Sequence, residues 1–171
     1  MTNSTILAQK LPKWLSVVLV SVLFCHFLGA MEQPSADASK AAYESGLKVE
    51  KDGKLDDAIT LWEKALELDP KNWACLNHYA WFLAVSAPAD KKDLKKAEAL
   101  ALRAAEASGW KNKDVIDTVA EVYFQRKQFA QAVETQKKAL ADGLEGHSNR
   151  KYLEKQLQKF EEALKAAEPP K

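Results

Sequence analysis

The chain has 171 residues, long enough for one domain of ordinary size, and 47% of them are hydrophobic and 29% charged. This composition excludes an intrinsically disordered chain, because such chains combine low hydrophobicity with high net charge. The 25 Lys and Arg residues nearly balance the 24 Asp and Glu residues, so the formal charge is only +1. We find no basic stripe and no aromatic RNA-binding signature that would favour nucleic acid as a partner.

The first thirty residues differ from the rest. They contain no acid, and their only charges, Lys10 and Lys13, precede the apolar run WLSVVLVSVLFCHFLGA from Trp14 to Ala30. This pattern is typical of a secretory signal peptide, and we expect cleavage after Ala30 and a periplasmic or secreted protein. As a helix the run would span roughly 26 Å, short of a ~30 Å hydrocarbon layer. An uncleaved membrane anchor over residues 14–30 is the alternative, and it is the only contact with a membrane that we expect.

Residues 31–38, MEQPSADA, are small and polar and are predicted to form a linker. Beyond them, apolar residues recur with a helical period, and short turns separate the periodic segments. The predicted helices are three pairs and a single last helix: Ser39–Lys51 with Leu55–Leu68, Trp73–Ser86 with Leu94–Ala107, Lys113–Arg126 with Phe129–Ala141, and Asn149–Ala167.

Small residues recur at matching places in the three pairs. Ala80 lies 34 residues after Gly46, and Ala132 lies 35 residues after Ala97. Two antiparallel helices approach closely only where one presents a small side chain to a bulky one. The pattern therefore predicts three hairpins that pack side by side. The small positions are Gly46, Ala80 and Ala120 in the first helices and Ala58, Ala97 and Ala132 in the second helices.

This pattern over residues 39–145 resembles the tetratricopeptide repeat, a helix–turn–helix unit of 34 residues. The first pair matches best, through Gly46, Ala58, Trp62, Ala65 and Pro70. The resemblance implies an all-α superhelix, a solenoid of three repeats over residues 39–72, 73–110 and 111–145.

The later pairs depart from the family pattern at single positions. The third pair has Gln136 where a large aromatic residue is usual and Leu144 where proline is usual. The middle pair departs most, with Ala101 in place of the aromatic residue and a longer turn over Ala87–Asp93.

The last helix, within residues 148–167, has one narrow apolar stripe, formed by Leu153, Leu157, Phe160 and Leu164. Ser148 is the predicted N-cap. A solenoid needs such a helix at its open end, because the last repeat would otherwise expose its apolar face to water. We therefore predict a capping helix, with docking on a partner as the alternative.

In tetratricopeptide-repeat proteins, ligand peptides usually lie in the concave groove formed by the first helices of the repeats. The resemblance implies a groove of mixed aromatic and acidic character in this chain. The residues expected to line it are Tyr43, Leu47, Asn77, Trp81, Asp117, Glu121 and Phe124. For Trp81, one position from the packing face, a place in the core is equally expected.

The best-known subgroup of the family binds the C-terminal carboxylate of chaperones through a clamp of lysine, asparagine and arginine. The matching positions in this chain are Tyr43, Leu47, His78, Asp114 and Thr118. The resemblance therefore does not extend to this clamp, and we do not expect such a ligand.

No motif supports catalysis. The sequence has no Gly-x-Ser-x-Gly signature and no glycine-rich phosphate loop. Cys75 and His78 are three residues apart on a predicted helix, but two ligands do not make a closed metal site. We expect no enzyme activity, no metal and no cofactor.

Taken together, these patterns predict an exported, non-enzymatic scaffold that binds a protein or peptide segment in its concave groove. The alternative is a structural subunit of an envelope complex that assembles through its convex face or its C-terminal helix. Trp73 and Trp110 lie in or beside turns between repeats, where we expect them to seal the joins.

Overall fold

The computed structural model describes residues 35–141 and 143–168, so the predicted signal segment lies outside the described residues. The elements in these ranges are a helix over residues 35–51, α2 (Leu55–Leu68), α3 (Trp73–Trp81), the π-helix η1 (Phe82–Ser86), the 3₁₀ helix η2 (Ala89–Lys91), α4 (Leu94–Ala107), α5 (Lys113–Gln125), α6 (Phe129–Ala139) and α7 (Arg150–Ala167). None of these helices is long and apolar enough to cross a membrane.

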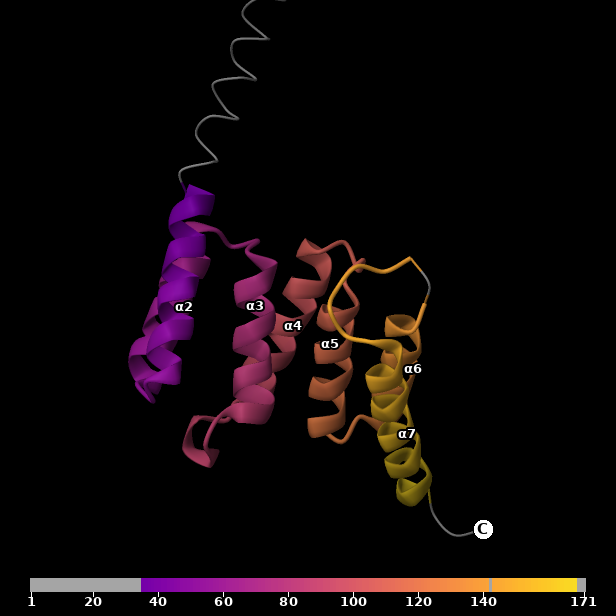
Figure 1. The fold of residues 1–171 in the computed structure, drawn as a ribbon. Coiled ribbons are helices and arrows are strands. Elements are labelled where there is room, and N and C mark those ends of the chain that lie inside the picture. The colour runs from indigo at the N-terminus through magenta and orange to yellow at the C-terminus, as the bar shows by residue number, and fades with distance from the viewer. Residues whose placement is uncertain (1–34, 142, 169–171) are drawn as a thin grey trace, which may run out of the picture.

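The helices form three hairpins stacked side by side, with α7 at the far end of the stack (Figure 1). We call helix 35–51, α3 and α5 the A helices, and α2, α4 and α6 the B helices. The predicted all-α solenoid of three hairpins and a capping helix is confirmed. One boundary differs: residues 35–38, predicted to be linker, are already helical, so helix 35–51 begins four residues earlier than expected.

Asparagine is the N-cap residue of three of the described helices, α3, α5 and α7. The side-chain oxygen of Asn72 accepts a hydrogen bond from the Cys75 amide at the start of α3, and Asn112 accepts from the Asp114 and Val115 amides at the start of α5. At α7 the N-cap is Asn149, not Ser148 as predicted. Such caps satisfy amides that the first helical turn leaves without partners.

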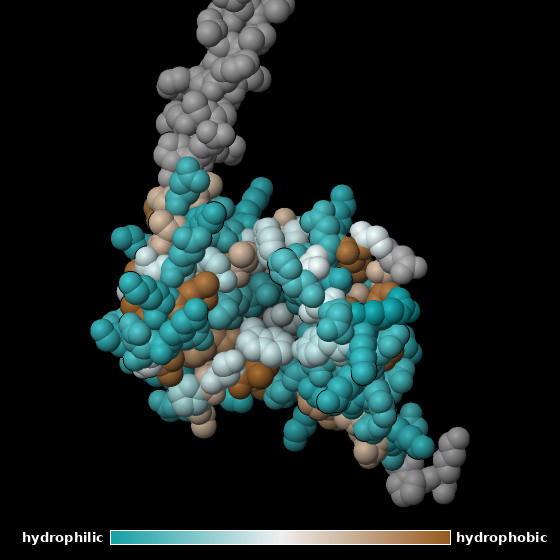
Figure 2. All heavy atoms as spheres, in the orientation of Figure 1, coloured by the Kyte–Doolittle hydropathy of each residue, from teal (hydrophilic) through white to brown (hydrophobic). Residues whose placement is uncertain are grey.

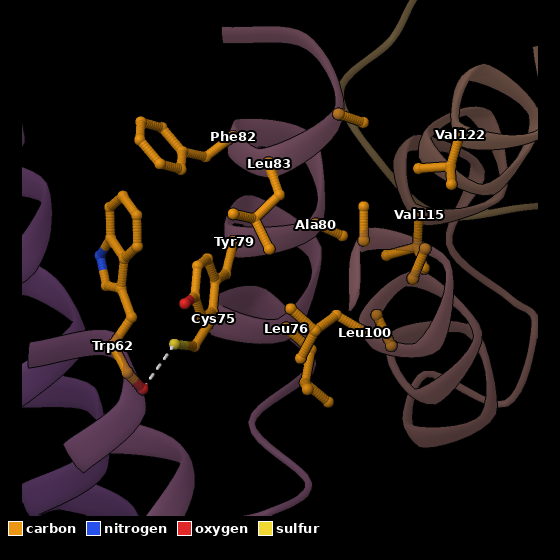
Figure 3. Packing of buried hydrophobic residues seen from close by; sticks show 14 of the residues in the cluster. Trp62, Cys75, Leu76, Tyr79, Ala80, Phe82, Leu83, Leu100, Val115 and Val122 are labelled. Carbon is orange, nitrogen blue, oxygen red and sulfur yellow. Dashed lines mark hydrogen bonds between the residues drawn. The ribbon is translucent and has the colours of Figure 1, made fainter. Parts of the chain in front are cut away.

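The core between the first two hairpins is built around Trp62, which is fully buried. Its ring lies 5.4 Å from the ring of Tyr79 and 5.2 Å from that of Phe82, centroid to centroid. Figure 3 shows these side chains together, with the Cys75 Sγ donating to the Trp62 carbonyl oxygen at 3.6 Å. A Cβ at Gly46 would lie only 2.4 Å from the Trp62 Nε1, so the indole can occupy this place only against glycine.

The alanines predicted to let hairpins approach are buried as expected: Ala58, Ala97 and Ala132 have no exposed surface. Because a methyl group fills little space, the facing helix can lie close to each of them. The repeat pattern read from the sequence therefore corresponds to the contacts that hold the stack together.

The last helix, α7, packs on α6 and closes the open end of the stack. Leu153 and Phe160 from its apolar stripe are buried, and Leu157 and Leu164 pack beside them while partly exposed. In the order of helices, α7 takes the place of a fourth A helix (Figure 1). The apolar stripe is thus used inside the molecule.

Candidate functional site

The seven residues predicted to line the groove come from the three A helices. Tyr43 and Leu47 lie on helix 35–51, Asn77 and Trp81 on α3, and the other three on α5. Figure 2 shows one face of the molecule in the orientation of Figure 1, with a hollow near its middle between more hydrophilic flanks. The structure separates them into an N-terminal group of four and a C-terminal group of three that contacts α7; Asp117 and Glu121 are buried, and the other five, including Phe124, are half-buried.

The N-terminal group, Tyr43, Leu47, Asn77 and Trp81, is half-buried, and each side chain keeps part of its surface exposed. We call these four residues the open groove. Trp81 does not belong to the buried core, which answers the question that its position in the sequence left open. Leu47 and Tyr43 also pack against the core on their inner side.

The polar partners of the open groove come from neighbouring A helices. The Nε2 atom of His78 and the Oε2 atom of Glu50 are 2.8 Å apart, which joins α3 to the end of helix 35–51. The Tyr43 ring lies edge-on to the His78 ring at 6.0 Å. Burial raises the pKa of Tyr43 to about 12, so its side chain is a neutral phenol at physiological pH.

Asn77 carries an unsatisfied hydrogen-bonding group. Its side-chain oxygen is buried and accepts no hydrogen bond within the described part of the chain, although the residue as a whole is half-buried. A buried polar atom without a partner costs free energy, and a donor that reaches it recovers that cost. Because this oxygen is itself buried, a ligand in the groove does not reach it while the side chain keeps this position.

The C-terminal group, Asp117, Glu121 and Phe124, contacts α7, although Phe124 stays half-buried. The Tyr152 hydroxyl donates to the Asp117 Oδ2 at 3.3 Å, and the Lys159 Nζ donates to the Glu121 Oε2 at 2.7 Å. Both carboxyl side chains are buried. The structure thus does not place them in an open groove, because the capping helix lies against the face of α5 that carries them.

Aromatic packing completes the contact between α5 and α7. The rings of Phe124 and Phe160 are 5.0 Å apart, and the Lys159 Nζ lies over the Phe124 ring at 4.4 Å from its centroid. A cation over an aromatic face is held by the ring quadrupole. Phe124 therefore acts as an anchor for α7.

Burial shifts the pKa of Asp117 away from its ordinary value. Burial raises its pKa to about 6, although the hydrogen bonds from Gln136 and Tyr152 act in the opposite direction. The Gln136 Nε2 donates to the Asp117 Oδ1 at 2.8 Å. Gln136, which departs from the usual aromatic residue of the repeat, thus supplies a polar partner for a buried acid.

The carboxylate-clamp positions do not form a cationic site. Asp114 accepts hydrogen bonds from the His147 and Ser148 amides, and Thr118 is buried and donates to the Asp114 carbonyl oxygen. Asp114 thus holds the turn before α7, and Tyr43, Leu47 and His78 at the remaining positions supply no lysine, asparagine or arginine for a ligand carboxylate.

The described residues hold neither a cluster of metal-ligating side chains nor a reactive cysteine. No group of three or more His, Cys, Asp or Glu side chains is gathered there in a way that could hold a metal ion. The Cys75 thiol is buried, and burial raises its pKa to about 12, so the reactive thiolate does not form at physiological pH.

Comparison with known proteins identifies the architecture. No protein-family model matches the chain, and no curated protein sequence matches it. Among solved structures it is similar to the TPR domain of Sgt2 from Aspergillus fumigatus, with 25% sequence identity and a TM-score of 0.59. The match covers 78% of this chain and 85% of that domain. The fold is that of a tetratricopeptide-repeat solenoid.

Proposed function

We propose that this protein is an exported, non-enzymatic scaffold that binds an extended protein segment in the open groove formed by Tyr43, Leu47, Asn77 and Trp81. The observation that carries the proposal is the division of the A-helix face. In its C-terminal part Asp117 and Glu121 are buried under α7, whereas all four residues of the open groove keep exposed surface on two adjacent helices.

The open groove offers two kinds of contact. Tyr43 and Trp81 are rigid aromatic side chains, and aromatic anchors supply most of the binding free energy in many interfaces. Between them, the half-buried Leu47 and Asn77 add one apolar and one amide side chain to the same surface. The ligand class is therefore a segment with one or two apolar side chains. A free carboxylate end is not required.

Assembly through the C-terminal helix, the alternative function, has less support. The apolar stripe of α7 is packed against α6 and α5, so its outer face is mainly Lys, Glu and Gln. A partner that docked on that stripe would have to displace Phe160 from the core. Assembly of a larger complex through the convex face is therefore the proposal that competes with peptide binding in the open groove.

A peptide-selection experiment tests the groove. A random peptide library would be panned on the purified chain, and the selected peptides titrated against Trp81→Ala and, as a matched control, Trp110→Ala. We expect Trp81→Ala to weaken binding at least tenfold, because it removes an aromatic anchor, and Trp110→Ala to change it less than twofold. Equal losses in the two variants, or no selected peptides, would reject the open groove as the binding site.

A further inference from the structure

Two tryptophans at one end of the stack are exposed. Trp73 begins α3 and keeps 41% of its surface exposed, and Trp110 lies in the turn before α5 and keeps 40%. The expected sealing role is therefore only partly met, since much of each indole faces outward. The starts of α3 and α5 lie at the same end of the molecule (Figure 1), which we call the tryptophan end.

Trp110 has a backbone conformation that is rare for a bulky residue. Its φ is 57° and follows the φ of 62° at Gly109, so two successive residues are left-handed. The left-handed region is a rare place for a bulky side chain and costs roughly 1–2 kcal/mol. The conformation ends α4, because the Trp110 N–H donates to the Ala105 carbonyl oxygen at 2.8 Å and the Gly109 N–H to the Glu106 carbonyl oxygen at 3.0 Å.

The start of helix 35–51 lies at this same end (Figure 1). The Ser39 Oγ donates to the Ala65 carbonyl oxygen at 2.7 Å and accepts a hydrogen bond from the Asn72 Nδ2 at 2.9 Å. Because Asn72 directly precedes Trp73, these bonds hold the beginning of the helix close to the first exposed tryptophan. The chain that precedes residue 35 therefore joins the stack beside the tryptophan end.

The distance from the apolar run to the stack is short. Only residues 31–34 separate Ala30 from the helix that begins at residue 35, and the five Cα–Cα steps span at most roughly 18 Å. The linker of 31–38 predicted from the sequence would have reached roughly 30 Å. In a chain that keeps residues 14–30 in a bilayer, the start of helix 35–51 thus lies within roughly 18 Å of that segment's end, on the same side of the stack as the tryptophan end.

We propose that, in the chain that retains residues 14–30, the tryptophan end rests on the bilayer surface with the indoles of Trp73 and Trp110 among the lipid headgroups. Tryptophan prefers this depth, because its ring is apolar and its N–H is polar. Two half-exposed indoles bind a membrane weakly on their own. A short tether raises their effective concentration at the surface to about the millimolar range, which makes the contact persistent.

The charges at this end indicate which lipids are needed. Exposed Lys71 and Lys111 lie in the same turns as, or close to, exposed Glu106 and Glu145, so the surface has both signs. The indoles, not the charges, therefore provide the attraction, and zwitterionic phosphatidylcholine suffices. The opposite end has exposed lysines, including Lys54 and Lys127, but none of the exposed tryptophans, and lies the length of helix 35–51 away.

Quenching by brominated lipid tests the contact. The full chain with Trp14→Phe, which removes the tryptophan of the apolar run, would be reconstituted into phosphatidylcholine nanodiscs with bromine on the acyl chains near the headgroups. We expect at least a quarter of the tryptophan fluorescence to be quenched. Adding Trp73→Gln and Trp110→Gln should remove most of that quenching, whereas adding Trp81→Gln should not. Circular dichroism checks that each variant is folded.

Three results would overturn the proposal. The first is no quenching with Trp14→Phe alone, or quenching that persists when both exposed tryptophans are replaced. The second is a blue shift of their emission that grows with protein concentration in lipid-free detergent, which would mean that a second copy covers them. The third is a native chain cleaved after Ala30, found by N-terminal sequencing. None of these results bears on peptide binding in the open groove, so the two proposals fail separately.

Discussion

The two halves of the A-helix face have the same repeat architecture but different surfaces. In the N-terminal half, Tyr43 and Trp81 keep exposed surface. In the C-terminal half, α7 lies against α5, and Asp117 and Glu121 are buried under Tyr152 and Lys159. The comparison teaches that the exposure of a groove residue is decided by the next helix along the stack, not by the helix that carries it.

Removing the central anchor of α7 should produce the largest effect. Phe160→Ala deletes a fully buried ring and its contact with Phe124, and we expect a loss of about 3–5 kcal/mol in urea unfolding. Gln158→Ala, on the exposed face of the same helix, should change stability by less than about 0.5 kcal/mol.

Amide hydrogen exchange in the Phe160→Ala variant would show whether the N-terminal and C-terminal halves of the stack unfold separately. With Phe160→Ala, the amides of α5 and α6 should exchange faster, while those of helix 35–51 and α2 should change little, because repeats in a solenoid are coupled mainly to their neighbours. Equal acceleration in both halves would show that the stack unfolds as one unit and that α7 supports the open groove as well.

The glycine contact of the first hairpin is the corresponding test in the N-terminal half. Gly46→Ala would place a Cβ 2.4 Å from the Trp62 Nε1 and should cost about 1–3 kcal/mol, measured by urea unfolding. In a Trp62→Phe background the indole nitrogen is gone, so the added cost of Gly46→Ala should fall by at least half. An unchanged cost in that background would mean that Trp62 is not what Gly46 accommodates.

Asp117 should give the C-terminal half a distinctive pH dependence. Its folded pKa of about 6 lies above the ordinary value of 3.8, so between these values the folded state holds more protons than the unfolded state. The Asp117 contribution to stability is therefore present at low pH and is lost as pH rises through about 6. The shift corresponds to about 2–3 kcal/mol.

Asp117→Asn isolates this contribution. Asparagine keeps an oxygen that can accept from Gln136 but carries no charge at any pH, so its stability relative to the wild type should rise between pH 4 and pH 7 by about 2 kcal/mol. Thermal unfolding of both proteins across this range measures the difference. A constant difference at every pH would contradict the raised pKa.

A matched pair of turns offers the smallest effect. The turn between helix 35–51 and α2 has Gly53 at φ 76°, and the turn between α5 and α6 has Lys127 at φ 62°. Lys127→Gly should stabilise the protein and Gly53→Lys should destabilise it, each by roughly 0.5–1 kcal/mol, because only glycine adopts this region freely. Thermal unfolding measures both. The same sign for the two changes would show that contacts other than backbone strain dominate there.

The sequence predicts which helices form the A-helix face, but not which of its residues are covered. It places Asp117 and Glu121 in the groove because they lie on an A helix, yet their partners Tyr152 and Gln156 each follow by 35 residues. That spacing is one repeat length, so the period itself held the signal. Extending the repeat count to the last helix would have placed α7 beside α5.

Two helix boundaries also differ from the prediction, because the sequence near each of them allows more than one start. Ser148 and Asn149 are both residue types that favour the N-cap position, and Asn149 occupies it. The amides of His147 and Ser148 donate to Asp114 on α5, which holds these two residues in the turn before the helix. Similarly, residues 35–38 joined the first helix because Ser39 is bonded to Ala65 and Asn72, which anchors the helix start. Both outcomes depend on contacts between segments far apart in the chain.

By itself, the sequence determined the helices, their pairing into hairpins and the stacking of those hairpins. These follow from apolar periodicity and small residues at fixed spacing, which act within one hairpin or between adjacent ones. Only the tertiary structure decided which part of the A-helix face stays open and that Trp73 and Trp110 share one end with the start of helix 35–51. The exposure of a side chain depends on which other helix packs against it. The sequence of the helix that carries the side chain does not determine where that other helix lies.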